Sequence, residues 1–549
     1  MKITQERRGD TATRRVSANR SGIIAPVRTP EVIVSFPRSS GVLLHPTSLA
    51  GRFGIGDLGK EARRFADFLI ASDQSLWQVL PLGPTGFGDS PYQCFSSFAS
   101  NPLLISPEWL VEDGLLAADD IKRPPRFPAD AVDFGRVIDY KAALLRRAFE
   151  NFRRTRRKSL RAEFVTFIDE AAHWLDDYAL FRALKDAHGG AAWNTWEPPL
   201  ARRDAAALAD ARRLLADQIE AQKLYQFLFH RQWSALKGYC NQNGIKIIGD
   251  IPIFVAYDSA DVWANPDLFK LNEDGSPRVV AGVPPDYFSK TGQLWGNPIY
   301  NWQRHRATGY RWWIERLRAT LSTVDVARID HFRGFAATWE VPAGDQTAER
   351  GQWVEVPGRE LFTQLREEFG EMPIIAEDLG VITPDVQALR DDFGFPGMRI
   401  LQFGFRNITN TDLPHNYVPN TVVYTGTHDN DTAVGWFNST AGRGSTRTAA
   451  QIEREKKFCM EYLNTDGREI NWDFIRAAQA SVACMAITPA QDLLGLGSQA
   501  RMNLPASTSG NWRWRMKPGA LTKGIGKRLR HLTQVYVRGR SQPKHTTTD

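Results

Sequence analysis

The sequence predicts an α/β fold: a (β/α)8 TIM barrel with helical and loop insertions around the C-terminal face of the barrel. Three observations support this prediction. Eight short apolar runs have the composition of buried parallel strands. Most of them are separated by stretches with helical periodicity, and three end at a carboxylate followed by polar or turn residues. The eight runs begin near residues 41, 76, 246, 325, 373, 398, 422 and 482.

The first two strands lie close together in the chain. Gly41–His45 is a short apolar strand, and Lys60–Ser72 places its apolar residues on one face of a helix. Leu76–Leu82 is the second strand. The segment Gly83–Pro102 that follows is rich in Gly, Pro and Ser, so we expect a loop at the end of that strand.

A helical insertion is expected after the second strand, at about residues 103–243. Its clearest helices are Leu144–Phe152, Glu163–Leu175 and Ala205–Phe229. This stretch is too long for a single crossover between neighbouring strands. After the third strand, residues 255–310 are rich in Trp, Tyr, Pro and Gly, and they predict a long loop region at the active site.

Basic segments flank the predicted barrel domain, residues 39–518. Residues 1–40 carry eight Lys or Arg against three Asp or Glu, and residues 517–549 carry eight against one. The residues between them therefore have a net charge of −5, although the whole chain has +7. We expect a disordered basic extension at 1–38 and a basic tail at 519–549 that begins with a short helix. The acidic balance of the barrel argues against a nucleic-acid channel through it.

Signals for membranes and metals are weak in this sequence. No apolar run approaches the ~18 residues that a membrane helix needs, and the four cysteines are scattered without a metal-type or redox pair. We therefore expect a cytoplasmic, monomeric protein without a metal or other cofactor, binding neither nucleic acid nor membrane. A plastid transit peptide is an alternative use of the N-terminal extension, which Glu6, Asp10 and Glu31 argue against.

Three strand ends carry carboxylates that fit glycoside chemistry. Asp330 ends the run Asp325-Val-Ala-Arg-Ile-Asp, Glu377 follows Pro373-Ile-Ile-Ala, and Asp429 follows the strand that begins at Val422. Any one such acid is more often a turn or cap residue. Three of them at strand ends of one barrel can converge on a single substrate.

The neighbours of these carboxylates indicate different roles. Arg328 lies two residues before Asp330, so both side chains point to the same face of the strand, and the arginine would keep this acid ionised. Glu377 follows apolar residues, so burial would raise its pKa and keep it a proton donor. Asp378 would point the other way. His428 can donate a hydrogen bond to a sugar hydroxyl.

Aromatic and glycine patterns add a second, weaker signal. Pro284–Gly296 mixes aromatic, polar and turn residues, as does Pro81–Gln93, and this composition is typical of a saccharide track. About half of the aromatic residues between 255 and 310 would simply pack in the core. Gly54–Gly59 and Gly495–Ala500 match dinucleotide-binding patterns, but the first does not directly follow its strand, so tight turns are favoured.

These motifs resemble the 4-α-glucanotransferases, called amylomaltases or disproportionating enzymes, of glycoside hydrolase family 77. The resemblance runs from about Gly41 to Met516. The motifs that carry it are Gly-Val-Leu-Leu-His-Pro-Thr-Ser-Leu at 41–49, Gly-Asp-Ser-Pro-Tyr-Gln at 88–93, Pro-Pro-Asp-Tyr-Phe at 284–288, Gly-Gln-Leu-Trp-Gly-Asn-Pro at 292–298, Arg-Ile-Asp-His-Phe-Arg-Gly at 328–334, Ala-Glu-Asp-Leu-Gly at 376–380, Thr-His-Asp-Asn at 427–430 and Gly-Asn-Trp-Arg-Trp-Arg at 510–515.

The resemblance implies a role for each motif residue. Asp330 would be the nucleophile, Glu377 the acid/base and Asp429 the stabiliser of the transition state. The other implied substrate-binding residues, in the donor site, the aromatic rim, the third strand and the covering loop, are Ser90, Tyr92, Asp250, Asp286, Tyr287, Phe288, Gln293, Trp295, Arg328, His331 and His428.

The implied reaction transfers a segment of an α-1,4-glucan (a maltooligosaccharide, starch or glycogen chain) to the 4-hydroxyl of glucose or another such glucan. It is a retaining double displacement, for which the Asp330 and Glu377 carboxyls should lie about 5–5.5 Å apart. Two alternatives stay open. One is an α-1,4-glucan hydrolase on the same scaffold, and the other is a non-catalytic glucan-binding protein, against which the intact set of three acids argues.

Overall fold

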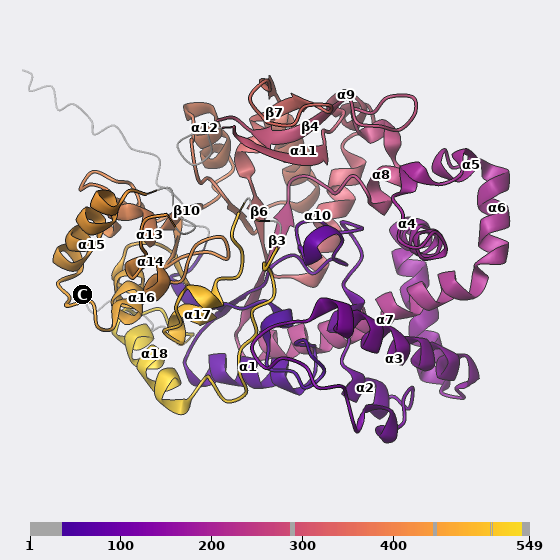
Figure 1. The fold of residues 1–549 in the computed structure, drawn as a ribbon, viewed down its shortest axis with the longest axis horizontal. Helices are drawn as coiled ribbons and strands as arrows, with labels where there is room; N and C mark the ends of the chain where they lie inside the picture. The colour runs from indigo at the N-terminus through magenta and orange to yellow at the C-terminus, as the bar shows by residue number, and fades with distance from the viewer. Residues whose placement is uncertain (1–35, 286–290, 443–446, 506, 508, 541–549) are drawn as a thin grey trace, which may run out of the picture. The chain divides into compact units, whose positions relative to one another are not determined.

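Eight parallel strands form the centre of the protein, each at a position that the sequence predicts (Figure 1). The computed structural model describes residues 36–285, 291–442, 447–505, 507 and 509–540. The strands are β1 Ser39–Leu43, β2 Leu76–Gln78, β3 Lys246–Pro252, β6 Val326–Asp330, β9 Ile374–Ala376, β10 Gly397–Ile400, β11 Thr421–Tyr424 and β12 Met485–Pro489.

The sheet closes on itself as a barrel. Its strand order is β10-β11-β12-β1-β2-β3-β6-β9, and all its pairings are parallel. The two end strands meet where the N–H of Ala376 donates to the carbonyl oxygen of Pro396 at 3.0 Å. The predicted (β/α)8 fold is therefore confirmed.

Asp378 reinforces this closure between β9 and β10. Its carboxylate accepts a hydrogen bond from the N–H of Met398 at 2.7 Å, and it forms ion pairs with Arg390 and, at 3.6 Å, with Arg399. These contacts hold Asp378 as part of the barrel wall. The neighbouring Glu377 is left to face the functional end of the barrel.

Helices surround the barrel and fill the long connection between β2 and β3. Helix α1, Lys60–Ala71, lies where Lys60–Ser72 was predicted. The helices between β2 and β3 are α2 Pro107–Glu112, α3 Phe134–Arg154, α4 Lys158–Ala187, α5 Pro198–Ala201, α6 Ala205–Leu214 and α7 Ala216–Gln242. The later helices are α8 Ala260–Ala264, α9 Trp302–Ala307, α10 Arg311–Thr323, α11 Gly358–Phe369, α12 Pro384–Asp392, α13 Leu401–Gly404, α14 Ala433–Phe437, α15 Ala449–Leu463, α16 Ile470–Ala480, α17 Ala490–Leu493 and α18 Lys523–Val535.

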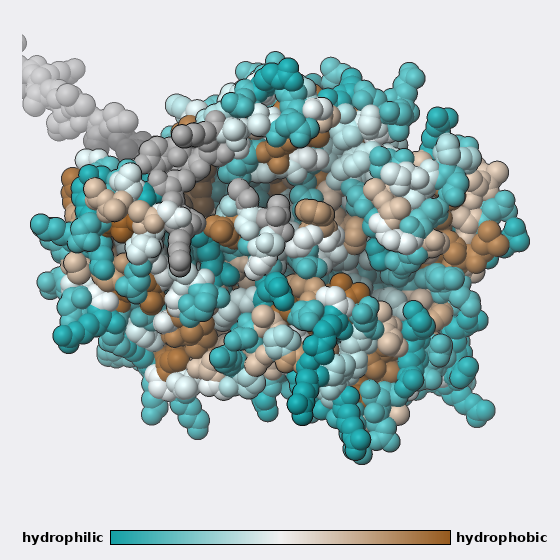
Figure 2. Space-filling view, viewed as in Figure 1, coloured by the Kyte–Doolittle hydropathy of each residue, from teal (hydrophilic) through white to brown (hydrophobic). Residues whose placement is uncertain are grey.

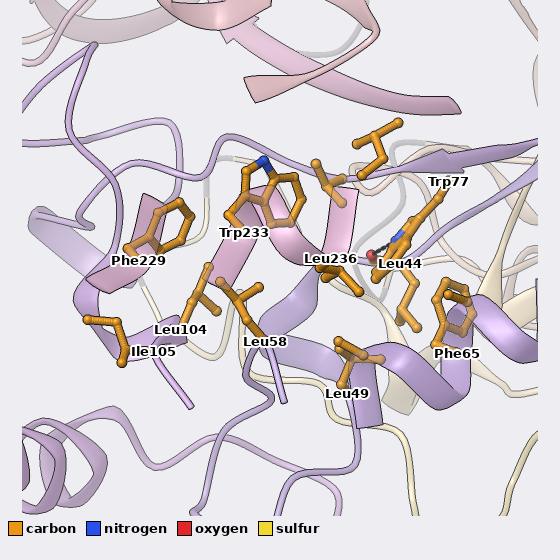
Figure 3. Close-up of a cluster of buried hydrophobic side chains, with 14 of the residues drawn as sticks. Leu44, Leu49, Leu58, Phe65, Trp77, Leu104, Ile105, Phe229, Trp233 and Leu236 are labelled. Carbon is orange, nitrogen blue, oxygen red and sulfur yellow. Dashed lines mark hydrogen bonds between the residues drawn. The ribbon is translucent and has the colours of Figure 1, made fainter. Parts of the chain in front are cut away.

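Apolar side chains pack on both faces of the barrel wall. Inside, a buried cluster includes Leu43, Val326 and Ile487, so the barrel interior is a packed core. Outside, Trp77 of β2 packs edge-on against Phe65 of α1, with ring centroids 4.9 Å apart (Figure 3). The indole N–H of Trp77 donates to the carbonyl oxygen of Leu44 at 2.8 Å, which satisfies a polar group in a fully buried side chain.

A second, antiparallel sheet lies beside the barrel, in the order β5-β4-β7-β8 (Figure 1). Its strands are β4 Val279–Val283, β5 Gln293–Pro298, β7 Ala337–Pro342 and β8 Gln352–Glu355. The first two lie in the segment 255–310, which was expected to be loop, so that expectation was wrong here. Gly and Pro are unfavourable in isolated strands. The stability that local composition lacks comes from pairing: β5 pairs with β4, and β4 pairs with β7, more than 30 residues later in the chain.

The described part of the predicted basic tail packs against the barrel. Helix α18 buries Leu529 and Leu532 in the main apolar cluster. Beyond it, the buried guanidinium of Arg538 donates to the carbonyl oxygens of Ser39, Gln479, Ser481, Ala483 and Cys484. Arg38, at the end of the predicted extension, donates to the carbonyl oxygen of Tyr536 at 2.9 Å. Residues 523–540 are thus part of the folded barrel rather than a loose tail, and residues 1–35 lie outside the described residues.

The visible surface is mostly polar. On the face drawn in Figure 2, apolar residues occur in small separate patches among hydrophilic ones. None of the helices in the described residues has both the length and the apolar character of a bilayer span.

Replacing Arg538 by Ala should lower the free energy of unfolding by about 3 kcal/mol, because buried carbonyl oxygens lose a charged donor. Urea denaturation followed by tryptophan fluorescence measures this change. Arg530→Ala is the control, since Arg530 lies exposed on α18 and should change the free energy of unfolding by less than about 0.5 kcal/mol. Equal effects of the two substitutions would show that Arg538 does not join the chain ends to the barrel.

Candidate active site

Carboxylates from four strands of the barrel gather at its C-terminal end. Asp250 lies on β3, Asp330 ends β6, Glu377 follows β9, and Asp429 lies in the loop after β11. A cleft of about 490 Å³ opens beside them. The predicted site residues that line this cleft are Ser90, Tyr92, Gln293, Trp295, Asp330, His331, His428 and Asp429.

The guanidinium of Arg328 connects two of these carboxylates. Its Nη1 lies 2.7 Å from both carboxylate oxygens of Asp250 and 3.0 Å from Oδ1 of Asp330. Asp250 also accepts a hydrogen bond from the Tyr92 hydroxyl at 2.7 Å. Burial raises the pKa of Asp250, while the charge of Arg328 opposes that shift. The predicted same-face arrangement of Arg328 and Asp330 is confirmed, and it fixes the direction in which the Asp330 carboxylate points.

Glu377 lies in a different electrostatic environment. Burial raises the pKa of its carboxyl to about 8; the charge of Arg328 lowers this pKa, and the charge of Asp330 raises it. The N–H of His331 donates to its Oε2 at 2.6 Å, and the N–H of Leu379 donates to its Oε1 at 3.2 Å. A carboxyl with this pKa is protonated at neutral pH, as a general acid must be.

His331 adopts a backbone conformation that is unusual for a residue with a side chain. Its φ is +53°, in the left-handed region. In this conformation its N–H points to Glu377 and its ring packs edge-on against Trp295, with centroids 4.8 Å apart. Strained backbone of this kind occurs at functional sites, where the surrounding structure maintains it.

Asp429 is held by residues that the sequence did not reveal as functional. The side-chain amide of Asn503 donates to its Oδ1 at 2.7 Å, and Arg501 donates to its carbonyl oxygen at 2.5 Å. The N–H of Asn503 donates to the carbonyl oxygen of His428 at 3.0 Å, and Nε2 of His428 lies 3.4 Å from Oδ1 of Asp429. Arg501 and Asn503 come after the eighth strand and carry no local motif that could have found them.

An aromatic wall borders the same cleft. The ring of Tyr92 stacks on His428 with centroids 5.1 Å apart, and both rings lie within 6 Å of Trp512, at 5.7 and 5.9 Å. The hydroxyl of Ser90 accepts a hydrogen bond from the N–H of Tyr92 at 3.2 Å. Trp512 was not among the predicted site residues, although it lies in the motif 510–515.

The second sheet also contributes residues to the cleft lining. Gln293 and Trp295 lie on β5, and the Trp295 indole donates to the Gln293 side chain at 3.2 Å. Asp286, Tyr287 and Phe288, which were also predicted, lie outside the described residues. Among the residues that the structure describes, no group of three or more His, Cys, Asp or Glu is arranged to hold a metal ion.

Comparisons of the sequence and the structure with known proteins identify 4-alpha-glucanotransferases as relatives. The sequence profile of the 4-alpha-glucanotransferase family of glycoside hydrolases matches residues 44–522. The chain is 50% identical over 514 residues to the 4-alpha-glucanotransferase of Thermus thermophilus, covering 92% of this chain and 100% of that protein. It is 44% identical over 520 residues to a chloroplastic/amyloplastic 4-alpha-glucanotransferase of Arabidopsis thaliana, covering 93% and 87%. Its structure is similar to that of an amylomaltase from Streptococcus agalactiae in complex with acarbose, with a TM-score of 0.86 and 42% identity over 91% of this chain and all of that one.

Replacing Asp330 by Asn should lower the pKa of Glu377, because the negative charge of Asp330 raises that pKa. Infrared spectra recorded from about pH 5 to about pH 10 detect protonated carboxyls. Subtracting the spectra of the same protein with Glu377→Gln added isolates the signal of the Glu377 carboxyl. Asp429→Asn is the control and should shift this titration less. A Glu377 carboxyl that titrates near its ordinary pKa in the unmodified protein would contradict the assigned environment.

Proposed function

Because the chain belongs to the 4-alpha-glucanotransferase family, we propose that it transfers a segment of an α-1,4-glucan to the 4-hydroxyl of glucose or of another α-1,4-glucan. The match over residues 44–522 and the relatives of this name support the proposal. The observation that carries its chemistry is the pairing of Asp330, bound to Arg328, with Glu377, whose pKa is about 8.

The first step breaks the glycosidic bond of the donor. Asp330 attacks the anomeric carbon from the side opposite the leaving oxygen, and a covalent β-linked glycosyl intermediate forms. Glu377 donates its proton to the leaving oxygen, which departs as the 4-hydroxyl of the released sugar. The hydrogen bond from Arg328 holds one carboxylate oxygen of Asp330 in place, and the other oxygen is available to attack the anomeric carbon.

The second step reverses these roles on a new sugar. Glu377, now a carboxylate, removes the proton from the acceptor's 4-hydroxyl as that oxygen attacks the anomeric carbon. The bond to Asp330 breaks and the α-configuration is restored. Asp429 and His428 hold hydroxyls of the reacting sugar and favour its distorted ring, and Asn503 fixes the direction of Asp429.

The remaining cleft residues bind the glucan. Tyr92 and Trp295 present ring surfaces to sugar C–H faces, while Ser90 and Gln293 lie where they can bind hydroxyls. Asp250 supports the donor site through Arg328 and Tyr92. From the resemblance of their motif, the proposal also assigns Asp286, Tyr287 and Phe288 to the loop that covers the cleft.

Transfer, rather than hydrolysis, requires that a sugar outcompete water for the intermediate. The relatives are 4-alpha-glucanotransferases, which favours transfer. We infer that the protein acts as a monomer in the cytoplasm or, if its N-terminal extension is a transit peptide, in a plastid.

Incubation with maltotriose tests the function directly. Transfer should produce glucose together with longer maltooligosaccharides, at a constant number of reducing ends, because each bond broken is replaced by another. Chromatography of the products and a reducing-end assay measure both quantities. Rising reducing ends would identify a hydrolase, and unchanged maltotriose would identify a protein that binds glucan without converting it.

Asp330→Asn should reduce turnover of maltotriose below detection, because an amide is too weak a nucleophile to form the intermediate. Its affinity for maltodextrin should stay measurable by calorimetry, since the cleft is otherwise unchanged. Asp325→Asn is the matched control: Asp325 lies at the other end of the same strand, where it accepts from the N–H of Ile247 at 2.7 Å. The role of Asp330 is refuted if Asp330→Asn turns over maltotriose at the unmodified rate.

A further inference from the structure

One loop carries two of the residues assigned to the sugar. It runs from Thr425, just after β11, to Ala433, the first residue of α14, and it contains His428 and Asp429. A hydrogen bond inside the loop joins the N–H of Thr427 to the side chain of Asn430 at 2.8 Å. Such a loop keeps its catalytic geometry only if both of its ends are fixed to the barrel.

Both ends are held by the same side chain. The hydroxyl of Thr425 donates to Oδ2 of Asp492 at 2.6 Å, and the N–H of Ala433 donates to Oδ1 of Asp492 at 2.7 Å. Each carboxylate oxygen therefore holds one end of the loop. Thr425 and Ala433 are eight positions apart in the chain, and a single carboxylate sets the spacing between them.

Asp492 is itself firmly placed. It lies on α17 after the last barrel strand, its side chain is 1% exposed, and its carbonyl oxygen accepts from the Asn471 amide at 2.8 Å. Burial raises its pKa to about 6; the bonds from Thr425 and Ala433 lower this pKa, and the charge of Asp431, which faces it from the loop, raises it. At neutral pH the carboxylate is mostly ionised, so both oxygens accept hydrogen bonds.

We propose that Asp492 is a positioning residue for glucan transfer: it holds both ends of the loop that presents His428 and Asp429 to the sugar. This inference rests on the proposed function, because it assigns the effect of Asp492 to the transition-state role of Asp429. Asp492 is not among the residues that line the cleft. It acts through the loop, where a displacement of about 1 Å can cost about 100-fold in rate.

Three substitutions distinguish the effects of the two hydrogen bonds that Asp492 accepts, from Thr425 and from Ala433. Asp492→Leu removes both, and kcat should fall about 100-fold while KM for the donor changes little. Asp492→Asn should keep kcat within about threefold, because its carbonyl oxygen can accept from Ala433 while its NH2 donates to the Thr425 hydroxyl. Thr425→Val releases one end only, and kcat should fall about tenfold. Thr425→Val is the variant that mere loss of packing would not explain, because it keeps the side-chain volume and removes only the hydroxyl that binds Asp492.

Asp261→Leu is the matched control. Asp261 is also a buried aspartate whose pKa burial raises to about 6, and it accepts a hydrogen bond from the N–H of Ser97 at 2.8 Å. It has no contact with the loop between Thr425 and Ala433 among the described residues. Asp261→Leu should lower the melting temperature about as much as Asp492→Leu does. Its kcat should stay within about threefold of that of the unmodified enzyme.

A double-mutant cycle with Asp429→Asn decides whether Asp492 acts through Asp429. With α-maltotriosyl fluoride as donor, the leaving group needs no proton, so the slow variants remain measurable. Asp492→Leu should lower kcat by less than about threefold when Asp429 is already Asn. A full and equal loss in both backgrounds, or no loss in either, would overturn the proposal. Failure of the proposed function would instead appear as absence of transfer by the unmodified enzyme.

Discussion

The buried contact between Arg328, Asp250 and Asp330 determines the chemistry of the barrel's functional end. Arg328 is only 3% exposed, and a buried guanidinium is tolerated when carboxylates surround it. Two carboxylates so close together in turn need a cation between them. The parallel register of β3 and β6 produces this contact, since it pairs Asp250 with Arg328 and Pro252 with Asp330. Strand pairing thus positions Asp330, the proposed nucleophile, independently of any substrate.

The same arrangement places Asp330 and Glu377, two carboxyls with similar ordinary pKa values, in different environments. Asp330 has a direct hydrogen bond from Arg328. Within the part of the chain that the structure describes, the Glu377 side chain accepts hydrogen bonds from backbone N–H groups alone, and burial is the largest influence on its pKa. The left-handed His331 joins the two, because it follows Asp330 in the chain and points its N–H at Glu377. These environments suit the roles proposed for the two acids, Asp330 as nucleophile and Glu377 as proton donor.

The barrel strands were largely predictable from the sequence, because each depends on a short stretch of neighbouring residues. Each strand lies in a short apolar run of the sequence, and the two-residue spacing of Arg328 and Asp330 puts them on one face whatever the rest of the fold does. Contacts between distant segments were not predictable in this way. No neighbouring motif in the sequence marks Asn503, Asp492 or Arg538. Their roles depend on contacts that only the fold creates: Asn503 with Asp429, Asp492 with Thr425, and Arg538 with backbone carbonyl oxygens. The second sheet was missed for the same reason, since β5 is stabilised by a partner strand rather than by its own composition.

Trapping the covalent intermediate tests the central claim most directly. In Glu377→Gln, α-maltotriosyl fluoride can still form the intermediate because fluoride leaves unprotonated, but the second step lacks its base and the intermediate should accumulate. Mass spectrometry of the digested protein should then find one maltotriosyl group, on the peptide that contains Asp330. A maltotriosyl group on a different carboxylate, or turnover of the fluoride with no covalent species at any time, would contradict the account.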